Sequence, residues 1–302
     1  MSWIVPLDIG LLMGLLLAWA VLALALGFRL LDFPDLTVEG SFPLGAAVFA
    51  VLHRTGVPML LSIPCAMLAG GLAGALTGFL HVRFRLNKFL SGIIVIAIAY
   101  SLSLRIMGGS NIGLLGLSSV FDCVERLEES LPGGVHLWTA LLLVGFLLVG
   151  STLILGALAT RTGLRLRVAG SNPNYARALG INVPANLVLG LAATNCLAAL
   201  SGVLLAMHQG FADVGMGQGV LILALAAMTI GERLLPEKRL PFHAFVLVAA
   251  VVGSVAYQVV VAYAVRVGLA PTDLKLATAV MVLAVVALRV SRDGNLLSEV
   301  QQ

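Results

Sequence analysis

The sequence predicts an all-α fold: a polytopic transmembrane helical bundle, an inverted repeat with about nine membrane segments. The first observation is composition, because 60% of the 302 residues are hydrophobic, 11% are charged and the mean hydropathy is +1.07. Soluble domains carry about 25% charged residues. The second observation is a set of apolar runs of membrane-crossing length. The third is that the order of these runs recurs along the chain.

Seven apolar runs have about the 20 residues that one helix needs to cross a bilayer. They cover residues 9–28, 58–80, 88–107, 136–159, 187–207, 241–265 and 274–290. Strand-like alternation is missing from these runs, so helices that satisfy their own backbone hydrogen bonds fit better than a transmembrane barrel. Two shorter stretches, 42–52 and 219–231, each follow a polar segment that contains glycine. We predict that these two are short or broken membrane segments.

The basic residues predict the orientation, because cytoplasmic loops carry an excess of Lys and Arg. With nine crossings and an outside N-terminus, most of the 18 basic residues fall inside. These are Arg29, Arg83, Arg85, Lys88, Arg161, Arg165, Arg167, Arg177, Arg233, Lys238, Arg239, Arg289 and Arg292. We therefore predict a multi-pass protein of the plasma membrane with its N-terminus outside and its C-terminus in the cytoplasm.

An offset of 178 residues lays the second half of the chain on the first. Phe33-Pro-Asp35-Leu and Phe211-Ala-Asp213-Val share the pattern Phe-x-Asp-aliphatic, and the same offset aligns four apolar runs in order. The odd number of crossings between the copies inverts the second one, a plan common among transport proteins.

We interpret residues 1–302 as a single transmembrane domain with four parts. They are a first repeat at 9–107, an extracytoplasmic loop at 108–135, a linking span with a cytoplasmic loop at 136–186, and a second, inverted repeat at 187–290. The extracytoplasmic loop is acidic, and it is either a solvated turn or a docking surface for an extracytoplasmic partner.

The polar segment before each short stretch is the candidate substrate pathway, because interrupted segments at matching places in two halves mark binding sites in transporters. Asp35 and Asp213 have two interpretations. Each caps the short helix that follows, or each lines the pathway and contacts substrate. Thr37, Glu39 and Ser41 have the same two interpretations, and Gln209 begins the second polar segment.

Arg105 is a further candidate for the pathway, because it lies four residues after Ser101 and so shares a helix face with it. Tyr100 belongs to the same run. Arg105 either extends outward to the membrane surface or attracts anions at the outer mouth of a pathway.

The cytoplasmic loop contains a short helix with clear end signals. Asn172 is placed to cap it, Pro173 suits its first position and Gly180 ends it. The segment predicts a two-turn helix outside the bilayer, either an ordinary connector or a stiff element that transmits a push.

Several kinds of chemistry are disfavoured by the sequence. No glycine is followed by lysine, so the phosphate-binding loop GxxxxGK[ST] is absent and the chain is not expected to hydrolyse ATP. The five histidines show no metal-ligand spacing, and the three cysteines form no CxxC pair. We expect no enzyme activity, no metal, no cofactor on this chain and no nucleic acid partner.

Five segments together carry a family resemblance. They are LDFPDLTVEGSF (31–42), YSLSLRIMG (100–108), GSNPNYARALG (170–180), ALSG (199–202) and QGFAD (209–213). With them the chain resembles the permease subunits of bacterial ATP-binding-cassette importers, of the branched-chain amino acid and ribose type, near the branch labelled as tryptophan/tyrosine permeases. The resemblance runs from about residue 10 to 290.

The resemblance implies a homodimer or pseudodimer in the bacterial inner membrane, cytoplasmic ATP-binding subunits and an extracytoplasmic solute-binding protein. It also implies that the helix at 173–179 is the coupling helix, which sits in a groove of the ATPase. Its candidate residues are Arg167, Gly170, Asn172, Pro173, Arg177 and Gly180. ATP would be bound by the partner, and the imported solute would be a small molecule, with an aromatic amino acid as the first guess.

A second function remains open from the residues alone. The chain could be a stand-alone secondary transporter or channel in which Asp35, Glu39 and Asp213 bind the coupling ion.

Overall fold

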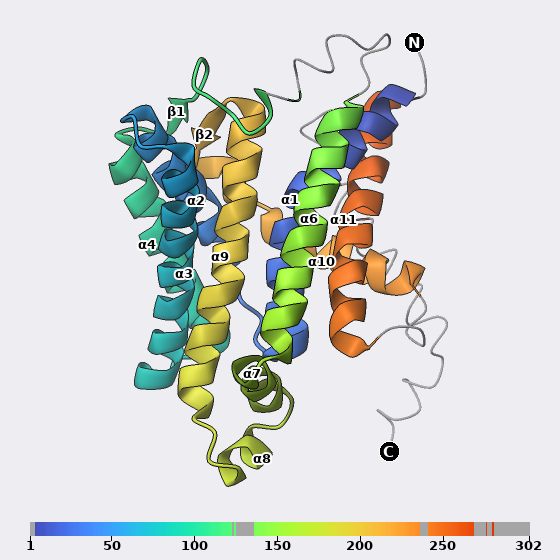
Figure 1. Ribbon diagram of the computed structural model, residues 1–302. Coiled ribbons are helices and arrows are strands. Elements are labelled where there is room, and N and C mark those ends of the chain that lie inside the picture. Colours follow the sequence, from blue (N-terminus) through green and yellow to red (C-terminus); the bar gives the residue numbers. More distant parts are fainter. Residues whose placement is uncertain are drawn as a thin grey trace.

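The computed structural model describes residues 4–122, 124, 136–235, 241–268, 276 and 280. Most of its long helices run roughly parallel to one another in a single bundle (Figure 1). In order, the elements are α1 (Ile4–Leu30), α2 (Val38–Arg54), α3 (Met59–Phe84), α4 (Lys88–Met107), β1 (Asn111–Gly113), α6 (Leu137–Ala159), α7 (Arg161–Ser171), α8 (Pro173–Ala178), α9 (Val183–Gln209), β2 (Phe211–Asp213), η1 (Val214–Gly217), α10 (Val220–Leu234) and α11 (Phe242–Arg266).

The bundle confirms the predicted polytopic helical fold. Seven helices in the described part are long and apolar enough to cross a membrane, one of them being η1 with α10. The short stretch 42–52 lies in α2, which has 17 residues and falls below that length, and 219–231 lies in α10 apart from Gly219, which precedes this helix. The run 274–290 falls almost wholly outside the described residues. The predicted count of about nine segments is therefore not confirmed.

The centre of the bundle is formed by α1, α2 and α9. Leu16, Leu22 and Leu24 of α1 are almost completely buried, as are Phe42 and Phe49 of α2. By contrast, α6 is buried over only a small part of its length. The most apolar and most enclosed positions thus lie on helices from both halves of the chain, which share one core.

Corresponding helices of the two predicted repeats have similar lengths and neighbours. Helices α1 and α9 both have 27 residues, α2 and α10 have 17 and 15, and α3 and α11 have 26 and 25. The first helix of each half packs along the third helix of the other half, α1 on α11 and α9 on α3.

Small residues allow these helices to approach closely. Gly70, Gly74 and Gly78 form one stripe on α3, and a side-chain carbon at any of them would overlap atoms of α9. Close approach through glycine is the usual way in which membrane helices gain packing contacts, because lipid provides no hydrophobic drive for their association.

A small sheet departs from the expected all-α structure. Strands β1 and β2 pair antiparallel, with Asn111 opposite Asp213 and Gly113 opposite Phe211. The sheet lies at the end of the bundle where α1 begins, and α7 and α8 lie at the other end (Figure 1). Helix α7 is also additional, because only the two-turn helix after it was expected in this loop.

Candidate functional site

A buried polar network surrounds the break between α1 and α2. Asp35, which is 1% exposed, accepts hydrogen bonds from the backbone N–H of Thr37 at 2.9 Å and from the side-chain amide of Asn195 in α9. The Asn195 oxygen in turn accepts a hydrogen bond from the Ser41 hydroxyl at 2.6 Å. One amide group thus joins the carboxylate before α2 to the first turn of α2.

The network extends to α3 through a contact between two threonine hydroxyls. Thr37 and Thr77 lie 2.6 Å apart between their Oγ1 atoms, and both side chains are fully buried. A second hydrogen bond from the Asn195 amide reaches the carbonyl oxygen of Leu191 at 2.8 Å. Buried polar groups in a membrane protein are costly unless they are paired, and these are paired with one another.

Asn195 and Thr77 were not among the residues predicted from the sequence. Both lie inside long apolar runs, where a single polar residue does not interrupt the hydropathy. An asparagine in the middle of a membrane-spanning run is nevertheless a usable signal, because its amide needs a partner from another helix.

Asp35 and Asp213 make the same local contact at equivalent positions. Asp213 Oδ1 accepts from the backbone N–H of Gly215 at 2.6 Å, two residues further along, as Asp35 does from Thr37. In the second half this contact caps the 3₁₀ helix η1, and in the first half it closes a turn just before α2. The two surroundings differ, because Phe33 is 1% exposed and Phe211 is 45% exposed.

Glu39 connects the beginnings of the two short helices. Its carboxylate Oε1 accepts a hydrogen bond at 2.7 Å from the backbone N–H of Gly219, which precedes α10. Glu39 itself lies in the first turn of α2, so its negative charge is close to the positive ends of both helices. The position equivalent to Glu39 is Gly217, and a side-chain carbon there would overlap the Glu39 carbonyl oxygen. The absence of an acidic side chain from this position of the second half therefore has a steric reason.

The other predicted pathway residues lie apart from this network. Tyr100, Ser101 and Arg105 are exposed on α4, and the Ser101 hydroxyl donates to the carbonyl oxygen of Ala97. Gln209 is exposed at the end of α9, beside the strand that pairs with β1. The structure therefore places the candidates in four locations: the buried network, the junction of α2 with α10, the exposed face of α4, and the segment around β2 that includes Gln209 and Asp213.

Two ion pairs lie toward the end of the bundle that carries α7. The Arg29 guanidinium, at the end of α1, binds the Glu232 carboxylate near the end of α10 through both Nε and Nη2. Lys88 contacts Asp32, and its ammonium group lies 5.7 Å from the centre of the Phe33 ring. Both pairs hold the first helix to its neighbours at this end.

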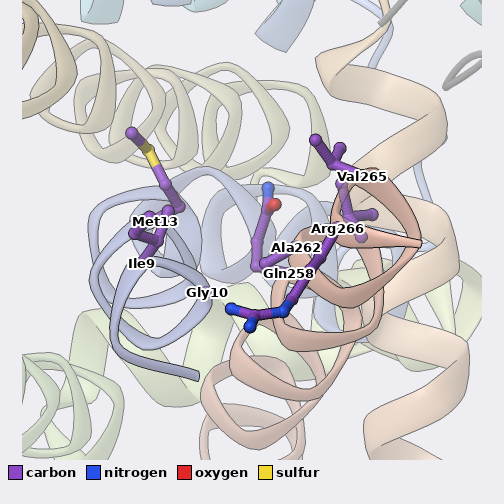
Figure 2. Close-up of a pocket in the computed structure, with 8 residues that line it drawn as sticks. Ile9, Gly10, Met13, Gln258, Ala262, Val265 and Arg266 are labelled. Carbon is purple, nitrogen blue, oxygen red and sulfur yellow. The ribbon is translucent and has the colours of Figure 1, made fainter. Parts of the chain in front are cut away.

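A cavity of about 350 Å³ lies between α1 and α11. Figure 2 shows its labelled residues, with Ile9, Gly10 and Met13 on α1 and Gln258, Ala262, Val265 and Arg266 on α11. Its lining is mostly apolar, and it contains none of the predicted pathway residues. Within the described ranges no group of three His, Cys, Asp or Glu side chains is placed to hold a metal ion.

The predicted coupling helix has the expected end contacts. The Asn172 side chain accepts a hydrogen bond from the backbone N–H of Tyr175 at 3.0 Å, Pro173 is the first residue of α8, and Gly180 has a φ of +73°. The helix ends at Ala178, one residue earlier than expected. Arg177 is exposed and donates to the Asn174 side chain at 2.9 Å.

Arg167 and Gly170 belong to α7, the helix that directly precedes α8. Gly170 lies against the end of α1, where any side chain would overlap the carbonyl oxygen of Leu30. Helix α7 is thus packed closely beneath the bundle, and α8 extends beyond it (Figure 1). The structure describes no partner chain, so the role of these residues in coupling stays a prediction.

A family model described as the permease component of branched-chain amino acid transport systems matches residues 7–287. A tyrosine transport system permease protein of Clostridioides difficile is 36% identical over 278 residues, which cover 91% of this chain and 88% of that protein.

More distant similarity reaches other transport systems. An uncharacterised protein of Rickettsia prowazekii is 32% identical over 85% of this chain and 88% of its own length. The ribose import permease protein of Escherichia coli is 24% identical over 65% of this chain and 60% of its own length. No solved structure gives a significant match. Since the family model covers nearly the whole sequence, this chain belongs to the family of permease components of branched-chain amino acid transport systems.

Proposed function

We propose that this chain is the membrane subunit of an ATP-driven importer that passes an amino acid, tyrosine or a similar aromatic one, into the cytoplasm. The observation that carries the proposal is the similarity to a tyrosine transport permease over 91% of the chain. The absence of a GxxxxGK[ST] motif from the sequence supports a separate ATP-binding subunit as the source of energy. An extracytoplasmic solute-binding protein would deliver the amino acid and supply most of the selectivity.

In this proposal the two halves of the chain form an inverted repeat. Supporting it are the equal lengths of α1 and α9, the reciprocal packing of α1 on α11 and of α9 on α3, and the matching contacts of Asp35 and Asp213. Transport would follow from alternating access, in which the two ends of the pathway open in turn and ATP-driven movement of the partner changes their relative stability.

The pathway would form between two copies of the chain, on the face of α4 that carries Tyr100, Ser101 and Arg105. These side chains are exposed in one copy. Charged and polar residues within membrane segments usually face a bundle interior or a water-filled cavity rather than lipid. A second copy would enclose this face, and Arg105 at its outer end would attract the carboxylate of an incoming amino acid.

Helix α8 would transmit the ATP-driven movement of the partner subunit to the membrane helices. This helix extends from the bundle at the end opposite the β-sheet (Figure 1), and the excess of basic residues supports a cytoplasmic location for that end. Its capped ends make it stiff, and Arg177 gives it a positive, exposed side chain for an acidic groove on the ATPase.

Reconstitution of the complex tests this function. The permease, its ATPase and its binding protein are placed in proteoliposomes, and uptake of labelled tyrosine is measured with and without ATP. We expect ATP-dependent uptake for the native protein and at least about a tenfold loss for Arg177→Glu, because a reversed charge at an interface costs on the order of 1.4 kcal/mol or more. Arg83→Glu, in the last turn of α3 at the same end, serves as the control and keeps its uptake.

Two outcomes would contradict the proposal. Uptake that proceeds without the ATPase and follows a proton or sodium gradient would show the chain to be a secondary transporter. Full uptake by Arg177→Glu would show that α8 does not couple the ATPase to transport, even if transport itself required ATP.

A further inference from the structure

An apolar cavity of about 340 Å³ lies beside α7, at the end of the bundle opposite the β-sheet. The helices α1, α6, α7 and α9 all contribute to its wall. The lining residues are Leu26, Leu30, Leu31, Ile154, Ala157, Leu158, Thr160, Thr162, Gly163, Leu166, Arg167, Leu189, Gly190, Ala193, Thr194 and Leu197. Most of this surface is aliphatic, so a hydrocarbon chain would be a suitable occupant.

The segment at one end of this cavity is strongly basic. Arg167 lines the cavity, and Arg161 and Arg165 are exposed on the same helix. The sequence contains no Asp or Glu from residue 160 to residue 182. Within the described part of the chain, none of these three arginines forms an ion pair with an acidic side chain. The cavity therefore combines an apolar interior with a positively charged segment at one end, which no acidic side chain in the described ranges pairs.

The position of the cavity matches the edge of a bilayer. Helix α6 has 23 residues, or roughly 34 Å at 1.5 Å per residue, which is close to the thickness of the hydrocarbon core. It ends at Ala159, and α7 begins two residues later at Arg161. The arginines of α7 thus lie at the depth of lipid headgroups, while Leu26 and Ile154 lie further into the hydrocarbon.

Because α6 is little buried, lipid in the surrounding leaflet can reach the cavity beside α7. Of the seven candidate spans it is the least buried in one copy of the chain. Its neighbour across the cavity is α9, whose Leu189 and Ala193 are exposed although they lie within a membrane helix. A molecule in the surrounding leaflet can therefore reach the cavity from the side.

We propose that this cavity binds an anionic phospholipid, with one acyl chain among the leucines and its phosphate beside Arg167, the arginine that lines the cavity. Basic pockets between membrane helices on the cytoplasmic side are suited to anionic headgroups, and each nearby arginine contributes about fivefold to affinity. The proposal rests on the cytoplasmic placement of α7 in the proposed function. The bound lipid would hold α7 against α6 and α9, directly before the coupling helix α8.

Lipid retention by the purified full-length chain tests the proposal. Native mass spectrometry in detergent measures the binding of phosphatidylglycerol and of phosphatidylcholine with identical acyl chains. We expect phosphatidylglycerol to bind at least about tenfold more tightly. Arg167→Gln should lower its affinity about fivefold, and Arg83→Gln, in the last turn of α3, serves as the matched control and should change it less than about twofold.

A second pair of variants tests the cavity separately from the charge. Ala157→Phe adds a ring inside the cavity and should remove the binding of phosphatidylglycerol. Gly156→Phe adds the same ring next to it, where a side chain meets open space and does not line the cavity, and should leave binding unchanged. Melting temperatures of both variants show whether they are folded.

Each contrary result overturns the lipid site. Equal binding of the two lipids would exclude recognition of the headgroup charge, and full binding by Ala157→Phe would place the lipid elsewhere. Competition by soluble glycerol phosphate as effective as that by the lipid would show a simple anion site. The lipid-binding assay requires neither ATPase activity nor uptake. A negative lipid result therefore does not contradict the importer proposal, and a negative uptake result does not affect the interpretation of lipid binding.

Discussion

At the scale of single residues, Asn195 contributes more to the site than its apolar surroundings suggest. It is fully buried in α9, and its amide binds Asp35, Ser41 and a backbone carbonyl at once. Removing such a group leaves several buried partners unpaired, and one of them is a carboxyl group. The cost of an unpaired buried group exceeds the net value of the hydrogen bond that is lost.

Replacing Asn195 tests this role. Asn195→Leu should lower the free energy of unfolding in detergent by about 2 to 4 kcal/mol, because Asp35 and Ser41 lose their partner. Asn186→Leu, on the same helix but partly exposed, should cost less than about 1 kcal/mol. A denaturant titration followed by circular dichroism measures both.

An exchange of the two side chains provides the stricter test. Asn195→Asp alone places two carboxyl groups together and should be the least stable variant. Combining it with Asp35→Asn restores one carboxyl and one amide, so we expect part of the stability to return. If the double variant is no more stable than the sum of the single changes predicts, the two residues are not coupled in the folded protein.

The sequence predicts only some residues of the buried polar network, and the reason is physical. Asp35 and Asp213 were recognisable, because a carboxylate before a short membrane helix needs an unusual environment. Asn195 and Thr77 were missed, because one polar residue barely changes the hydropathy of a long run. Their partners come from other helices, and only the packed bundle brings them together.

At the scale of helices, the packing of α3 on α9 depends on the absence of side chains. Gly74 faces the backbone of Leu191 and the side chain of Asn195. Because both are fixed in the core, neither can move away from an added side chain.

Gly74→Val should therefore prevent close packing and destabilise the fold by more than about 3 kcal/mol, the upper range for overpacking a tight core. Gly145→Val on α6 is the matched control, because a side chain there meets nothing within 4 Å. Size-exclusion profiles and melting temperatures in detergent measure the difference. Equal stability of the two variants would show that α3 does not pack on α9 as described.

In the described part of the chain, helices were predicted correctly where the apolar runs are long, and one helix was missed where charged residues interrupt the apolar positions. The short stretches 42–52 and 219–231 are both helical, as expected. Helix α7 was missed because three arginines interrupt its apolar residues. Its start signal is present in the sequence, since the Thr160 hydroxyl accepts a hydrogen bond from the backbone N–H of Gly163.

At the scale of the whole molecule, the two halves meet where α2 and α10 begin. The carbonyl oxygen of Glu39 lies against Gly217, and its carboxylate binds the backbone of Gly219. Contact between equivalent positions is what a two-fold relation predicts near its axis. In this account Glu39 is a hydrogen-bond acceptor that fixes the junction of the halves, whereas an ion-driven transporter would need its ionisation.

Two substitutions of Glu39 separate these roles. Glu39→Gln keeps an oxygen for the Gly219 N–H, so uptake should stay within about threefold of the native rate, while Glu39→Leu should lower it more than about tenfold. Uptake in proteoliposomes measures both. Loss of uptake in Glu39→Gln equal to that in Glu39→Leu would favour a titrating carboxylate and the secondary transporter.

In the proposed function, the β-sheet end and the α8 end of the bundle lie on opposite sides of the membrane, with α8 facing the ATPase. The most direct measurement is labelling of intact cells with a membrane-impermeant maleimide, in a background in which Cys65, Cys123 and Cys196 have been replaced. Leu115 near β1 is 89% exposed and Leu179 after α8 is 57% exposed, so cysteines at both positions are accessible. The account predicts that Leu115→Cys is labelled in intact cells and that Leu179→Cys is labelled only after the cells are opened. Labelling of Leu179→Cys from outside would contradict it.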